Sequence, residues 1–208
     1  MKAQMRFQKY ICLAMIIVGA LATFYAFIYG TGALSELGYT LNNKNKSYFT
    51  ASKGLNDATL YLDIQPFNTA LMYCGIVMIL LAVVLYITAS HKRRNYYISN
   101  IVATSVCAGG NIIMSLVLLV MNGIWRDRFS KVDFEAWNKF WTDRLLVNPA
   151  SISHYNDSTV IFDLGFAVYV IVILASVALI LNLIWKIKLM QGEKKLLEGG
   201  QLTEVQAA

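Results

Sequence analysis

The chain of 208 residues is 57% hydrophobic and only 14% charged, whereas charged residues make up about a quarter of an ordinary soluble domain. The charges are missing from long uninterrupted blocks, which indicates membrane spans and argues against a soluble globular domain. The basic residues behind the net charge of +6 flank these blocks, which indicates orientation in a membrane and contact with lipid rather than nucleic-acid binding.

The first apolar block covers residues 10–29 and follows a basic segment, residues 1–9, that contains no acidic residue. A helix rises ~1.5 Å per residue, so about 20 apolar residues span the ~30 Å hydrocarbon core of a bilayer. The block is too long for the core of a typical signal peptide, and no clean small-x-small cleavage pattern closes it. We therefore expect an uncleaved first transmembrane helix over 10–29 and a cytoplasmic segment over 1–9.

Residues 30–67 are predicted as the first extracytoplasmic loop, because they are more polar and nearly neutral in charge. Within this loop, residues 58–64 alternate between apolar and polar side chains, which fits a short strand but also a helical turn on the membrane. Asn45 begins a triplet that matches the N-glycosylation pattern. The second transmembrane helix is predicted over 68–90, after Pro66.

The turn between the second and third apolar blocks, residues 91–96, is short and basic, with Lys92, Arg93 and Arg94 in a row. Short loops rich in Lys and Arg are retained in the cytoplasm, so these three residues are predicted to set the topology. Basic residues also lie before the first block and after the fourth, on the same predicted side. We therefore expect both termini in the cytoplasm and a multi-pass protein of the plasma (inner) membrane.

The third transmembrane helix, predicted over 97–121, differs from the second because polar residues recur along it. They are Asn100, Thr104, Asn111 and Ser115. Their spacings of four, seven and four residues place them on one face of a helix, together with Ala108. A polar side chain that faces lipid is costly, so this face is predicted to turn inward. It would serve helix–helix hydrogen bonding or, alternatively, line a path for a ligand or ion.

Residues 122–158 are predicted as the second extracytoplasmic loop, and an amphipathic helix is expected within it over 131–146. Its apolar stripe consists of Phe134, Trp137, Trp141 and Leu145. Such a helix lies in the membrane interface or covers the loop's own core, and its tryptophans could also anchor a protein partner. Asn156 begins a second triplet of the N-glycosylation type.

The fourth transmembrane helix is predicted over 159–185, with Asp163 near its outer start, where the helix dipole favours an acid. Lys186 and Lys188 mark its inner boundary, and the cytoplasmic tail covers 186–208. A helical continuation into the tail is expected to stop at the Gly199-Gly200 pair.

The residues that carry most enzyme and metal chemistry are scarce. The three cysteines all fall inside apolar blocks, and we interpret them as small buried hydrophobes. The two histidines, His91 and His154, lie outside the predicted spans, so we expect no haem, metal or other cofactor. No phosphate loop or hydrolase motif occurs, and the protein is predicted not to be an enzyme. The alternative is an enzyme at the outer surface that uses Asp163 with His154 and Asp157.

The sequence therefore predicts an all-α membrane protein, an antiparallel bundle of four transmembrane helices whose extracytoplasmic loops are capped by an amphipathic helix. The layout of four spans, two larger outer loops and a short basic inner turn resembles claudin and MARVEL-type tetraspan proteins. The outer-loop cysteines of claudins and the Cys-Cys-Gly of tetraspanins are absent, so the resemblance implies the layout alone. A compact bacterial inner-membrane subunit fits the layout equally well.

The function predicted from these features is that of a non-enzymatic membrane subunit, an accessory or scaffold subunit of a transporter complex. The polar and small residues of the third helix favour helix contacts, and the catalytic motifs are missing. The alternative is an oligomeric channel or small transporter in which the polar face of the third helix lines the path. The expected partners are membrane lipid and a protein partner or a second copy of the chain, and not nucleic acid.

Overall fold

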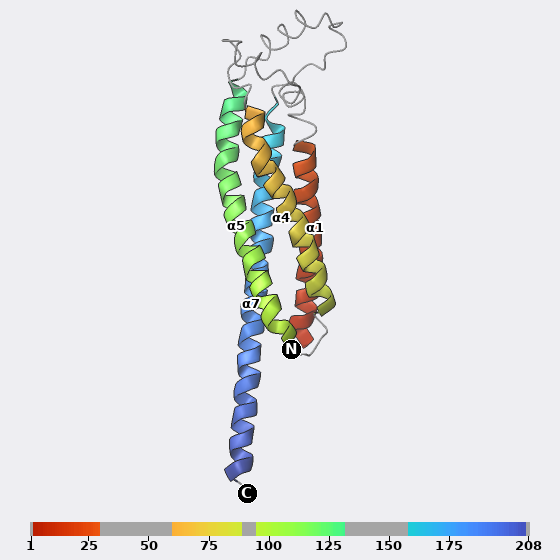
Figure 1. Ribbon diagram of the computed structural model, residues 1–208, viewed down its shortest axis with the longest axis vertical. Coiled ribbons are helices and arrows are strands. Elements are labelled where there is room, and N and C mark those ends of the chain that lie inside the picture. The colour runs from red at the N-terminus through yellow and green to blue at the C-terminus, as the bar shows by residue number, and fades with distance from the viewer. Residues whose placement is uncertain (1, 30–59, 89–94, 132–157, 207–208) are drawn as a thin grey trace, which may run out of the picture. The chain divides into compact units, whose positions relative to one another are not determined.

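The computed structural model describes residues 2–29, 60–88, 95–131 and 158–206, and these residues form four helices, labelled in Figure 1, with no strand among them. The helices are α1 (Lys2–Ile28), α4 (Leu60–Thr88), α5 (Asn95–Ser130) and α7 (Val160–Gln206). Each contains a segment that is long and apolar enough to cross a membrane: Arg6–Ile28, Asp63–Ile87, Ile101–Ser130 and Val160–Gly192. For the described residues, the prediction of an all-helical fold with four helices long and apolar enough to span a membrane is thereby confirmed.

Helix α4 begins at Leu60, well before residue 68, so the alternating residues from Leu60 onward are helical rather than extended. Leu60 and Ile64 are both buried, and their burial explains why the helix reaches this far. Pro66 lies inside α4. A proline there lacks an N–H for the helix ladder, and its ring tends to kink the helix.

Helices α5 and α7 also extend beyond the predicted spans. Helix α5 continues to Ser130, and the additional turns bury Trp125 and Phe129. The expectation that the Gly199-Gly200 pair ends the last helix was wrong, because α7 continues through it to Gln206. Glycine in a helix interior costs about 1 kcal/mol relative to alanine, but it keeps its backbone N–H, so the hydrogen-bond ladder is not interrupted.

Several predicted features fall outside the described residues, so the structure does not bear on them. One is the amphipathic helix over 131–146, which apart from Lys131 lies outside them together with its stripe of Phe134, Trp137, Trp141 and Leu145. The others are the basic residues Lys92, Arg93 and Arg94, the histidines His91 and His154, Asp157, and the triplets at Asn45 and Asn156.

The four helices divide into two compact units, and each helix contributes one segment to each unit. The first unit contains residues 2–20, 74–88, 95–113 and 171–206 of the described helices. The second unit contains residues 21–28, 60–73, 114–130 and 160–170.

Contacts within each unit show that the helices run antiparallel. In the first unit, Gly19 of α1 lies against Gly75 and Ile79 of α4, whereas Gln8, further back in α1, bonds to Leu85 further along α4. In the second unit, the Tyr25 ring of α1 packs on Tyr169 of α7, and the Tyr29 ring packs on Phe162. Helices α4 and α5 are antiparallel as well: Phe67 of α4 packs on Trp125 of α5, whereas the earlier residue Asp63 pairs with the later residue Arg128.

The buried side chains of α5 recur at alternating spacings of four and three residues. They are Thr104, Ala108, Asn111, Ser115, Leu118, Asn122, Trp125 and Phe129. A repeat of 3.5 residues is typical of helices that pack side by side in a bundle. The residues on the other side of α5, such as Val106, Ile113 and Val120, are large, apolar and exposed, as lipid contact requires.

Candidate functional site

The polar face predicted on the third helix is buried. Thr104, Asn111 and Ser115 are 3%, 3% and 1% exposed, and Ala108 between them is fully covered. Asn100 lies in α5, and its side chain is outside the described part of the structure. The three described polar residues therefore face the interior of the protein.

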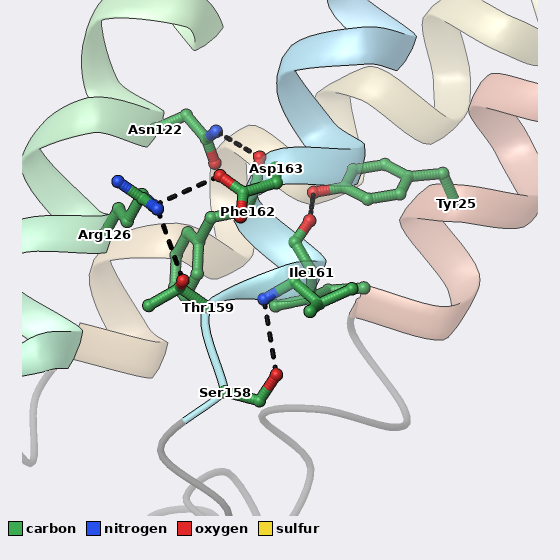
Figure 2. A network of polar contacts seen from close by, with 9 residues as sticks. Tyr25, Asn122, Arg126, Ser158, Thr159, Ile161, Phe162 and Asp163 are labelled. Carbon is green, nitrogen blue, oxygen red and sulfur yellow. Dashed lines mark hydrogen bonds and ion pairs between the residues drawn. The ribbon is translucent and has the colours of Figure 1, made fainter.

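The polar face continues to Asn122, seven residues after Ser115. Asn122 was predicted to lie in the outer loop. In the second unit, Asn122 Nδ2 donates a hydrogen bond to the backbone oxygen of Phe162 at 2.8 Å (Figure 2). The seven-residue interval that separates Ala108 from Ser115 also leads from Ser115 to Asn122, so an extended repeat could have identified this residue.

A second side chain bonds to the first turn of α7 from the opposite direction. Tyr25 Oη of α1 donates to the backbone oxygen of Ile161 at 3.0 Å (Figure 2). The Tyr25 ring stacks on Tyr29 with centroids 5.4 Å apart and meets Tyr169 edge-on at 6.0 Å. Each carbonyl oxygen has two lone pairs, so it can accept these bonds in addition to its bond within the helix. Helices α1 and α5 are thereby both tied to the beginning of α7.

Ion pairs beside these bonds join α5 to α7 and to α4. Arg126 Nε lies 3.2 Å from Asp163 Oδ1, and its guanidinium also approaches Thr159 Oγ1 at 3.4 Å. Arg128 Nη1 lies 2.7 Å from Asp63 Oδ2 in α4. Asp163 thus stands in the first turn of α7, as predicted, with an arginine beside it. Exposed pairs of this kind contribute roughly 0–1 kcal/mol each.

The first unit contains a buried amide cluster that the sequence analysis missed. Gln4 Nε2 lies 3.1 Å from Gln8 Oε1 and 3.2 Å from Asn182 Oδ1, and Gln8 Nε2 donates to the backbone oxygen of Leu85 at 3.2 Å. Lys186, one turn after Asn182, is also buried, at 8% exposure, rather than lying at an open boundary. Gln4 and Gln8 were assigned to the cytoplasmic segment 1–9, although α1 begins at Lys2.

Five buried polar atoms have no hydrogen-bond partner among the described residues. They are Tyr29 Oη, Ser115 Oγ, Asn122 Oδ1, Trp125 Nε1 and Ser176 Oγ. In the described part of the chain, no three His, Cys, Asp or Glu side chains are grouped closely enough to hold a metal ion. The buried polar groups of α5 are hydroxyls, amides and an indole N–H, which can form hydrogen bonds but do not ionise near neutral pH.

The glycines fall into two classes. A Cβ atom added at Gly19 would lie 2.8 Å from the backbone oxygen of Gly75, and one added at Gly165 would contact the Tyr25 hydroxyl. These two glycines therefore permit close contacts inside the protein. At Gly109 and Gly110 of α5, an added Cβ would meet nothing within 4 Å in the described structure. Gly110 is exposed between Val106 and Ile113, which are exposed as well.

The Asn122 bond leads to a prediction about stability. Asn122→Leu removes a 2.8 Å bond between two helices, whereas Asn111→Leu removes a weaker contact, 3.6 Å from Nδ2 to Cys107 Sγ within α5. We expect Asn122→Leu to lower the free energy of unfolding in detergent by about 1 kcal/mol. Asn111→Leu should cost clearly less, and equal losses in a denaturant titration of the two variants would contradict this assignment.

Comparison of the chain with models of protein families, with curated protein sequences and with solved structures gave no match. The functional proposal therefore depends on the residues and contacts of this chain alone.

Proposed function

We propose that the protein is a non-enzymatic integral membrane subunit that assembles laterally with a larger membrane complex, as an accessory or scaffold subunit of a transporter. The observation that carries the proposal is the pair Gly109 and Gly110 in the middle of α5, where an added Cβ would meet nothing within 4 Å in the described structure; Gly110 is exposed and Gly109 half-buried.

Two adjacent glycines are costly in a helix, at about 1 kcal/mol each relative to alanine. Gly19 and Gly165 offset that cost through close contacts within the chain, but Gly109 and Gly110 make none in the described structure. In a bilayer, helices associate through close packing at small residues, because lipid tails are as apolar as the side chains. The open glycine pair, bordered by Val106 and Ile113, is therefore a surface to which a helix from another chain can come close.

Both termini lie in the cytoplasm in the orientation that we propose. The described basic residues Arg6 and Lys9 lie near the beginning of α1, close to the N-terminus. Lys188 lies in the later part of α7, on the way to the C-terminus. This distribution supports an arrangement with both termini in the cytoplasm and the protein in the plasma (inner) membrane.

The alternative, an oligomeric channel lined by the polar face of α5, receives less support. A pore between copies of the chain would need Thr104, Asn111 and Ser115 at a surface between molecules, but these side chains are buried within one molecule. The same burial supports a structural role for the polar face, namely helix–helix contact within the chain.

The proposal is tested by purification from native membranes in mild detergent. Wild-type protein should copurify with one or a few partners in a fixed ratio, and the double variant Gly109→Leu/Gly110→Leu should lose them while its unfolding temperature does not fall. Gly192→Leu is the matched control, because Gly192 is likewise open and exposed in α7. A wild-type protein that stays strictly monomeric in several detergents, or a double variant that keeps its partners, would overturn the proposal.

A further inference from the structure

Of the five buried polar atoms that lack a hydrogen-bond partner among the described residues, four belong to the second unit. The hydroxyls of Ser115 and Ser176 can each turn to a carbonyl oxygen one turn back in their own helix. Tyr29 Oη and Trp125 Nε1 stand at the far side of a ring, away from their own backbone, and Asn122 Oδ1 can only be paired by a donor. A buried polar atom that is left unpaired loses its hydration without compensation, so native proteins almost always pair it.

Phe162, in the first turn of α7, is the common neighbour of two of these residues. Asn122 Nδ2 lies 2.8 Å from the backbone oxygen of Phe162 (Figure 2), and the Tyr29 ring packs edge-on against the Phe162 ring with centroids 5.8 Å apart. Trp125 follows Asn122 by three residues on the buried face of α5. Side chains of a helix lean toward its beginning, so the indole of Trp125 extends over the turn that carries Asn122.

The hydrogen-bonding chemistry of the three unpaired atoms restricts what can bind them. Trp125 Nε1 only donates, Asn122 Oδ1 only accepts, and Tyr29 Oη does both. A cation is repelled by the indole N–H and an anion by the amide oxygen, so neither suits the whole set. The three side chains are at most 1% exposed, which leaves room for a very small ligand only. Water is small, neutral, and both donates and accepts, and a buried water makes about three hydrogen bonds.

We propose that Tyr29, Asn122 and Trp125 form a binding site for one water molecule inside the second unit. The water accepts the indole proton, donates to Asn122 Oδ1 and shares a hydrogen bond with Tyr29 Oη. Proteins hold about one buried water per 27 residues, so one site among the roughly 50 described residues of this unit is within the usual number. Because Asn122 also bonds to Phe162, the water connects α1, α5 and α7, and the site requires no partner protein.

Tyr29→Phe in the full chain in detergent tests the site, because it removes one hydroxyl and keeps the ring. If the water is bound, the variant loses a hydrogen bond, and its unfolding equilibrium constant in a denaturant titration should rise about fivefold. If the hydroxyl is unpaired, its removal should leave the stability unchanged or raise it, and that result would overturn the site. Tyr73→Phe is the matched control, because Tyr73 belongs to the same unit and is 60% exposed, so its stability should equal that of the wild type.

A double-mutant cycle shows whether Tyr29 and Asn122 bind the same ligand. Once Asn122→Leu has removed one side of the water site, adding Tyr29→Phe should raise the unfolding equilibrium constant only about twofold or less. Full, independent effects of the two substitutions would show that Tyr29 is paired elsewhere and would overturn the site. If the double variant does not fold, the Raman signal of Tyr29, taken as wild type minus Tyr29→Phe, decides: a phenol in a hydrogen bond supports the site, and a free phenol overturns it.

Discussion

Gly19→Leu is expected to cost about 3 kcal/mol of unfolding free energy, the upper part of the range for overpacked cores. A Cβ atom at this position would lie 2.8 Å from the backbone oxygen of Gly75 and 2.8 Å from Ile79 Cγ1. Backbone cannot move aside as a side chain can, so α1 and α4 would have to separate. Chemical denaturation of the purified variant in the same detergent as the wild type measures the loss.

Gly110→Leu is the control for this prediction, because it makes the same change in a helix of the same unit where an added Cβ meets nothing within 4 Å in the described structure. We expect its unfolding free energy to equal that of the wild type or to rise slightly, since leucine favours the helix more than glycine does. Equal losses for Gly19→Leu and Gly110→Leu would show that the close approach of α1 and α4 is not a property of the folded protein.

These two glycines also show what the sequence could not reveal. Gly19 and Gly110 both stand inside charge-free blocks, and both are compatible with close helix contact. Whether each glycine is packed against another helix depends on which residues of the neighbouring helices face it, and only the folded molecule shows that. In the sequence both are small residues that permit close helix contact, whereas only the structure separates Gly19, which is in contact with α4, from Gly110, which is open.

The four helices were predictable because the thickness of a bilayer fixes the length of an apolar span, and the blocks of this chain have that length. The helix ends were less predictable. Hydropathy locates the part of a helix in lipid, but α4 begins earlier at Leu60 and α5 continues to Ser130. Gln4 and Gln8 were missed for the same reason, because a polar residue beyond the apolar block can still be buried by a neighbouring helix.

Phe162→Ala is expected to have a second large effect, because this side chain is fully buried at the beginning of α7. Its ring packs edge-on against Tyr29 of α1 at 5.8 Å between centroids, and against Phe129 of α5 at 5.2 Å. Its backbone oxygen accepts the bond from Asn122. Truncation would leave a cavity where three helices meet within the second unit.

The expected loss of unfolding free energy is about 3 kcal/mol, the lower end of the range for buried Phe-to-Ala substitutions. The loss arises because lipid cannot enter the closed core to replace the dispersion contacts of the ring. Leu164→Ala, two residues further along α7, is the matched control: Leu164 is 53% exposed, so its truncation should cost less than about 0.5 kcal/mol. Denaturation of both variants in one detergent provides the comparison. Since Phe162→Ala keeps the backbone oxygen that Asn122 binds, a loss far greater than that of Asn122→Leu would show that aromatic packing, more than the polar bonds, holds the second unit together.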